Sequence, residues 1–88
     1  MSKNRKVYQW TMFFTETNGF EYFIGADKEK VYREAWQRYC EERDHAEEVE
    51  TLVYASADTF EEFCEDTEHC IDTDGCGWIE LNFIEYEI

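Results

Sequence analysis

A short stretch in the second half of the chain gathers side chains that commonly bind metals. Cys64, Cys70 and Cys76 follow one another at intervals of six residues, and His69 stands directly before the second of them. Thiolates and imidazoles are preferred zinc ligands, but zinc fingers and ribbons bring two ligands together from a tight C-x2–4-C turn. Cys64 also falls on an apolar helical stripe, where a cysteine is usually a small core residue. A Cys/His metal-binding module is therefore an alternative, and the favoured prediction is that no metal is bound.

The same cysteines allow a second covalent possibility. A disulfide between Cys70 and Cys76 would close a loop that contains glycine, provided that the compartment is oxidising. The first residues, MSKNRK, lead into a strand-like segment and contain no apolar signal region, and no apolar run approaches the length of a membrane span. We therefore expect a soluble protein of the cytoplasm with reduced thiols.

Calcium binding and catalysis have weaker support in the sequence. Asp72-Thr-Asp74-Gly75 is similar to part of a calcium loop, but with the glycine at the sixth position Cys70 and Leu81 occupy the places that require Asp and Glu. We predict a turn there. The two histidines, His45 and His69, accompany no nucleophile elbow and no phosphate-binding glycine motif. The prediction is a protein that is not an enzyme and uses no cofactor.

Negative charge is concentrated in one part of the chain. The first forty residues hold seven basic and five acidic side chains, whereas the remaining forty-eight hold seventeen acidic ones and a single basic one, Arg43. The resulting net charge of −14 raises the free energy of a compact fold through repulsion, unless partners or counterions offset it. A solvated face or adaptation to high salt would account for such a surface. We favour contact with a basic surface of the kind that holds nucleic acid.

The spacing of the carboxylates suits such a surface. Side chains at i and i+4 of a helix lie about 5–6 Å apart at Cβ, and alternate strand residues repeat about every 6.7 Å, which approximates the distance between successive phosphates of a strand. Repulsion excludes direct contact with nucleic acid or an anionic membrane through this face. The predicted partner-binding residues are Glu41, Glu42, Asp44, Glu47, Glu48, Glu50, Glu61, Glu62, Glu65, Asp66, Glu68, Asp72, Asp74, Glu85 and Glu87.

Residues 1–88 are expected to form a single domain, because the chain has no proline-rich or glycine-rich linker and its aromatic content of 18% supplies a core.

The elements that position the predicted contact residues begin with a hairpin. Residues 6–15 alternate as a strand does, with Tyr8, Trp10, Met12 and Phe14 on one face. Asn18-Gly19 then predicts a hairpin with a type I′ turn, and residues 20–24 form its second strand.

Two helices are predicted next. Asp27 can cap a helix that runs to about residue 42. Residues 44–50 are expected to be a polar connection, followed by a short strand at 51–55. Asp58 or Thr59 caps a second helix through a capping box. The apolar stripe of the first helix consists of Val31, Tyr32, Ala35, Trp36, Tyr39 and Cys40, and that of the second consists of Phe60, Phe63 and Cys64.

The chain is predicted to end in a strand. Residues 68–77 are expected to be a loop and residues 78–88 a strand whose apolar alternation changes phase. Ile79, Leu81 and Phe83 share one face, and Ile84 begins a series on the opposite face. This change predicts a bulge near Phe83 and Ile84. The order ββαβαβ, with two helices packed on one face of a mostly antiparallel sheet, is an α+β fold.

In size, charge and α+β pattern the whole chain resembles the small acidic anti-defence proteins of phages, the anti-CRISPR and anti-restriction proteins. No motif is shared, so no residue role is transferred. The resemblance implies a nucleic-acid mimic in the host cytoplasm that binds a CRISPR effector complex or restriction enzyme and blocks nucleic-acid access. An immunity or antitoxin-like protein that covers the basic site of a nuclease toxin is the alternative with the same electrostatics.

Overall fold

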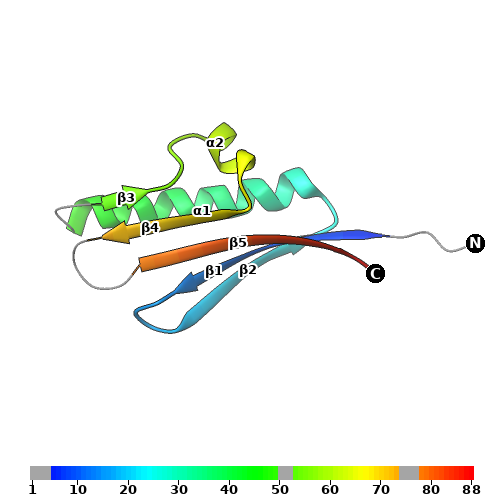
Figure 1. The fold of residues 1–88 in the computed structure, drawn as a ribbon, viewed down its shortest axis with the longest axis horizontal. Coiled ribbons are helices and arrows are strands. Elements are labelled where there is room, and N and C mark those ends of the chain that lie inside the picture. The colour runs from blue at the N-terminus through cyan, green and yellow to red at the C-terminus, as the bar shows by residue number, and fades with distance from the viewer. Residues whose placement is uncertain (1–4, 50–52, 74–77) are drawn as a thin grey trace, which may run out of the picture.

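The computed structural model describes residues 5–49, 53–73 and 78–88, which form a five-stranded antiparallel sheet with two helices on one face (Figure 1). The strand order across the sheet is β2-β1-β5-β4-β3. The α+β class predicted from the sequence is therefore confirmed. The elements are β1 (Lys6–Phe14), β2 (Gly19–Gly25), α1 (Lys28–Val49), β3 (Val53–Ala55), α2 (Phe60–Glu65), β4 (Glu68–Thr73) and β5 (Trp78–Glu87).

Strand β4 corrects the predicted element order. The sequence predicts a loop from residue 68 onward, whereas residues 68–73 pair with β5 on one side and with β3 on the other. Ile71 lies opposite Ala55 and Ile79, and it is buried together with His69. Two buried side chains and ladders on both sides compensate for the poor strand propensity of the acidic residues. The order is thus ββαβαββ.

Helix α1 is longer than predicted. It continues through residues 44–49, which the sequence suggests to be a polar connection. Ala46 packs against the core and so extends the apolar stripe by a further turn. At the other end, Asp27 accepts a hydrogen bond from the Lys30 amide at 3.2 Å, as predicted for a cap. In the part of the chain that the structure describes, no helix is both long and apolar enough to cross a membrane.

The β1–β2 hairpin is present, but its turn differs from the prediction. Phe14 lies opposite Gly19, so residues 15–18 form a four-residue connection and Gly19 already belongs to β2. Asn18 alone takes the left-handed conformation among the non-glycine residues described, with φ of 58°. Asparagine tolerates this region better than most residues do. The Asn-Gly pair therefore marks the hairpin correctly without forming a two-residue type I′ turn.

The predicted bulge in β5 is absent. Strand β5 pairs with β1 in one unbroken register from Lys6–Glu87 to Phe14–Ile79. Phe83 faces the helices, and Ile84 simply lies on the other side of the pleat, where about half of its surface is exposed. The apparent change of phase in the sequence therefore arises because both faces of β5 carry apolar side chains.

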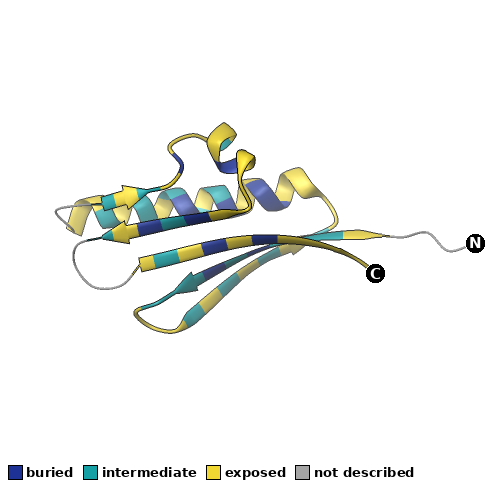
Figure 2. Ribbon diagram, viewed as in Figure 1, coloured by how far each residue is buried: buried dark blue, intermediate teal, exposed yellow. Residues whose placement is uncertain are grey.

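The core lies between the sheet and the helices, where the buried residues of Figure 2 gather. Trp10 on β1 is at its centre. Its ring lies 4.6 Å from that of Phe63 on α2, and 5.4 Å from those of Tyr32 on α1 and Phe83 on β5. Aromatic pairs at these distances add to the free energy of burial. This cluster joins both helices to the middle of the sheet.

Candidate functional site

The carboxylates of α2 and the start of β4 form a group of exposed charges close together in the chain. From Asp58 to Asp72 the chain contains no lysine or arginine. We call Glu61, Glu65, Asp66 and Glu68 the α2–β4 carboxylates. All four are exposed, and none forms an ion pair with any residue that the structure describes. Their negative charge is therefore available to a partner.

A capping box fixes the start of α2. The Thr59 hydroxyl accepts a hydrogen bond from the Glu62 amide at 3.1 Å, and the Glu62 carboxylate accepts hydrogen bonds from the amides of Thr59 and Asp58 at 3.2 and 2.9 Å. The predicted box is confirmed, with Thr59 as the cap. Glu62, one of the predicted contact residues, therefore uses its carboxylate within the fold.

His69 fixes the other end of this segment. Its Nε2 donates a hydrogen bond to the Phe63 carbonyl at 2.7 Å, and its Nδ1 lies 2.8 Å from the Ser56 hydroxyl. Because a carbonyl can only accept, the proton is on Nε2 and Nδ1 accepts from Ser56. That hydroxyl also accepts a hydrogen bond from the Cys70 amide at 3.0 Å. The imidazole thus joins α2, β4 and the end of β3.

The residues proposed for a Cys/His metal module do not converge. Both nitrogens of His69 are bonded to protein groups, so neither is free for a metal. Cys70 follows it on β4 and hence lies on the opposite face of the sheet. Cys64 is exposed on α2, which corrects its prediction as an inner-stripe residue. Cys76, with the proposed disulfide, lies outside the described residues, and the described ones contain no cluster of three metal-binding side chains.

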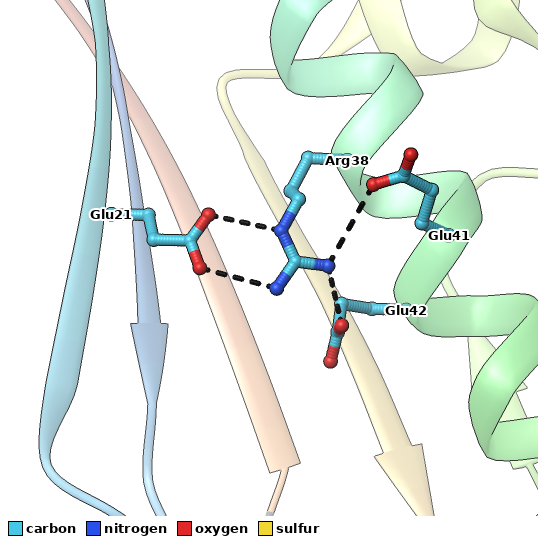
Figure 3. A network of polar contacts seen from close by, with 4 residues as sticks. All are labelled: Glu21, Arg38, Glu41 and Glu42. Carbon is cyan, nitrogen blue, oxygen red and sulfur yellow. Dashed lines mark hydrogen bonds and ion pairs between the residues drawn. The ribbon is translucent and has the colours of Figure 1, made fainter.

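Arg38 neutralises part of the acidic row on α1. Its guanidinium forms two hydrogen bonds with Glu21 on β2, at 2.9 and 3.1 Å, and also binds Glu42 (Figure 3). Glu41 lies 3.9 Å away. The hydrogen bonds with Glu21, followed by those with Glu42, raise the pKa of Arg38 despite its partial burial. The pair of Arg38 with Glu21 therefore joins the helix to the hairpin, while Glu41 and Glu42 contact the guanidinium from the same helix.

Arg43 reduces the charge of the next turn. It lies within ion-pair distance of Asp44 and Glu47, at 3.8 and 4.0 Å. In this row Glu48 is exposed and makes no ion pair with a described residue, and Glu50 lies outside the described residues. Most of the predicted carboxylates described on α1 thus lie on the surface of the helix but form ion pairs within the molecule.

The remaining predicted residues lie on both sides of the sheet. Glu85 and Glu87 share the face of Phe83, beyond the core, and Glu85 pairs with Lys6 at 3.4 Å. Asp72 and Glu68 on β4 project from the opposite face. Asp74 lies outside the described residues. The fifteen predicted carboxylates therefore do not form one continuous surface. Among them, the α2–β4 carboxylates are exposed, form no ion pair with described residues and lie within one short segment of the chain.

Sequence reasoning missed a large apolar surface on the open side of the sheet. No described element covers the face opposite the helices (Figure 1). We call the uncovered side of β2, β1 and β5 the open apolar face. The signal in the sequence is the series of apolar residues at alternate positions of 20–24 and 84–88. Its side chains are Val7 and Phe13 on β1, Phe20, Tyr22 and Ile24 on β2, and Ile84, Tyr86 and Ile88 on or directly after β5.

Comparison of the chain with protein-family models, with curated proteins and with solved structures gave no match.

Proposed function

We propose that the protein is an inhibitor that occupies the nucleic-acid-binding surface of a basic partner protein, and that the α2–β4 carboxylates are its main contact. The observation that carries the proposal is their exposure without an internal cation, on a chain of net charge −14. Unpaired like charges on one segment cost free energy in the free protein. Lysine and arginine side chains of a partner would remove this cost on binding.

The position of these carboxylates supports recognition of a groove that holds phosphates. Glu61 and Glu65 stand one helical turn apart on α2, which separates their Cβ atoms by about 5–6 Å. Asp66 ends the helix and Glu68 begins β4 on the opposite face of the sheet, and no basic residue interrupts this acidic segment along the chain. This spacing is comparable with that of backbone phosphates along a strand.

The segment is also held rigidly before any partner binds. The capping box at Thr59 and Glu62 fixes its start, and the bonds of His69 to Ser56 and Phe63 fix α2 against β4. A surface that is ordered beforehand loses less conformational entropy on binding. This order distinguishes the segment from a flexible acidic tail, which would be only weakly selective.

The resemblance to phage anti-defence proteins narrows the partner to a CRISPR effector complex or a restriction enzyme. Both classes hold DNA or RNA in positively charged channels, where a row of carboxylates can replace phosphates. The proposed mechanism is competition, because inhibitor and nucleic acid would pair with the same lysine and arginine side chains. No catalytic step by the inhibitor is required.

The test is a competition assay with purified effector complexes and restriction enzymes. We expect the full chain to displace DNA from one of them, with an affinity that falls steeply between about 50 and about 500 mM salt, as phosphate contacts do. The variant Glu61→Gln/Glu65→Gln/Glu68→Gln should weaken inhibition by roughly 10- to 100-fold, since three interfacial charge contacts are lost.

A matched control removes the same charge elsewhere. Glu34→Gln/Glu48→Gln/Glu87→Gln alters three exposed carboxylates that make no ion pair with described residues. We expect its inhibition to remain within about threefold of the unmodified chain, because net charge alone acts mainly on the association rate. Equal losses in the two variants, or inhibition that is independent of salt, would contradict the proposed contact.

A further inference from the structure

We propose that the open apolar face binds a second copy of this chain, forming a face-to-face dimer about a twofold axis parallel to β1. This inference does not depend on the proposed function. It starts from the composition of the face, in which Phe20, Tyr22, Ile24, Ile84 and Ile88 each expose between 51% and 73% of their surface. Clusters of this kind on a small protein mark interaction sites.

The register of the strands makes one row of the face self-complementary. Gln9 on β1 lies opposite Ile24 of β2 on one side and opposite Ile84 of β5 on the other. The three side chains therefore form a row that is symmetric about β1. A twofold axis along β1 leaves the position of each row along the strand unchanged. It therefore places Ile24 of one copy on Ile84 of its partner, and Ile84 of the first copy on Ile24 of the partner. This reciprocal contact is what an isologous interface requires.

The same axis keeps the carboxylates apart. The overlap covers β2, β1 and β5, while β4 and β3 of each copy extend beyond the partner's β2 edge. Glu68 and Asp72 on β4 therefore remain in solvent. The two β4 strands lie at opposite ends of the pair, about 19 Å apart at four strand spacings. This exceeds the Debye length of about 8 Å at physiological salt, so their repulsion is largely screened.

Charge also favours a second copy over a basic partner at this face. The side chains that alternate onto the overlap include Gln9, Thr11 and Asn82 beside the apolar residues, and Glu80 at one end is the one carboxylate on the described part of these strands that faces it. A cationic partner would find few carboxylates there to pair with. Another copy of this surface brings no unpaired cation to it, and the same axis places Glu80 of each copy against Phe20 of the other at one end of the overlap.

The area suits a weak dimer. Aromatic side chains bury about 150–250 Å² each when fully covered. Four large side chains that are about half exposed, Phe20, Tyr22, Ile24 and Ile84, lie in rows that β2 and β5 both span, and they can bury roughly 400 Å² per copy. Tyr86 and Ile88 lie beyond Gly25, the last residue of β2 in the register. An area of this size is typical of weak or transient interfaces. We therefore expect dissociation in the micromolar range, with monomers at low and dimers at high protein concentration.

The first measurement is the mass of the full chain in solution, by light scattering or sedimentation equilibrium. We expect twice the monomer mass at roughly 100 µM protein, and tighter association as salt rises from about 50 to about 500 mM, because salt screens repulsion between two acidic chains. This dependence is opposite in sign to that of binding to a basic partner. A monomer at every salt and protein concentration would overturn the proposal.

Paired variants test the contact itself. Ile24→Asp and Ile84→Lys each place one charge in the overlap, so each alone should raise the dissociation constant at least tenfold. An equimolar mixture should regain the dimer, because the new carboxylate of one copy then meets the new ammonium of the other. Circular dichroism checks that both variants keep the fold. A mixture that stays monomeric would refute the pairing of residue 24 with residue 84.

Tyr54→Asp is the matched control. Tyr54 is 63% exposed on β3, on the same side of the sheet but outside the overlap of β2, β1 and β5. Its substitution adds the same charge as Ile24→Asp and should leave the dimer mass unchanged. Loss of the dimer in this variant as well would assign the effect to total charge, and the proposed face would be wrong.

Discussion

The hydroxyl of Tyr39 and the backbone of Ala57 form a closed pair of hydrogen bonds. The hydroxyl accepts from the Ala57 amide at 2.9 Å and donates to the Ala57 carbonyl at 3.0 Å. Both residues are buried. One side chain of α1 thus satisfies the backbone of the connection between β3 and α2, which would otherwise lose hydrogen bonds to water without replacement. This pair anchors the connection that precedes α2 to helix α1.

Tyr39→Phe should therefore destabilise the protein. The change keeps the ring but leaves the buried Ala57 amide without its partner, which costs about 1–3 kcal/mol in free energy of unfolding. Urea denaturation followed by circular dichroism measures it. Tyr54→Phe removes an exposed hydroxyl and should change the free energy of unfolding by less than about 0.5 kcal/mol. Similar values for the two variants would show that the pair with Ala57 contributes little.

Stability should fall at alkaline pH. Burial raises the pKa of Tyr39 and of Tyr32 above the ordinary value of 10.0. The unfolded chain then releases these protons at lower pH than the folded one, so the two tyrosines leave the free energy of unfolding unaffected below pH 10 and decrease it above that pH. The half-buried thiol of Cys40, whose pKa burial also raises from 9.0, begins the decline at lower pH.

Denaturation series between about pH 8 and about pH 11 measure this dependence. Tyr39→Phe lacks one of the two tyrosines whose pKa is raised by burial. The free energy of unfolding should therefore decline less steeply above pH 10 than in the unmodified protein. An equal slope in both proteins would mean that Tyr39 does not contribute to it.

Arg38→Met should lower stability more than its surface position suggests. The substitution keeps much of the aliphatic length but leaves Glu21 and Glu42, held near the same guanidinium, without their cation. We expect a loss of about 1–3 kcal/mol, since charge-assisted bonds of a partly buried arginine are lost. Thermal denaturation at low and high salt measures it, and high salt should reduce the loss.

Arg33→Met provides the comparison for Arg38. Arg33 pairs with Glu29 at 3.4 Å, but both side chains are largely exposed. Such a pair contributes only a few tenths of a kcal/mol. If both variants unfold at the same temperature, the network of Figure 3 has no special stabilising role.

His69→Phe should destabilise the fold without any effect of metal. The new ring can stack on Phe63 as the imidazole does at 4.6 Å, but the Ser56 hydroxyl and the Phe63 carbonyl lose their partner. The expected cost is about 1–3 kcal/mol by urea denaturation. Added zinc should not shift the melting temperature of the unmodified protein. A stabilisation by stoichiometric zinc that disappears in His69→Phe would instead support the metal-binding alternative.

Local signals in the sequence were sufficient for several elements. The Asn18-Gly19 pair predicts the hairpin, the capping box of Thr59 and Glu62 predicts the start of α2, and the stripe from Val31 to Tyr39 predicts the buried side of α1. These features depend on interactions between residues a few positions apart. The same is true of the exposure of most carboxylates, because a small fold cannot bury so many charges of one sign.

Strand β4 and the pairing of charges could not be predicted from local signals in the sequence. Residues 68–73 become a strand because β5 and β3 lie on either side, and Arg38 binds Glu21 on β2 in addition to its helical neighbour Glu42. Both outcomes depend on residues distant in sequence.

The sequence by itself determined the charge, the α+β class and the spacing of apolar residues along each element, since these follow from composition and local periodicity. Only the tertiary structure decided which apolar face is covered. Alternation in β2 and β5 places apolar side chains on both sides of the sheet, and α1 and α2 can bury only one of them. Which carboxylates remain unpaired was decided in the same way, because ion pairs depend on distances that arise when the chain folds.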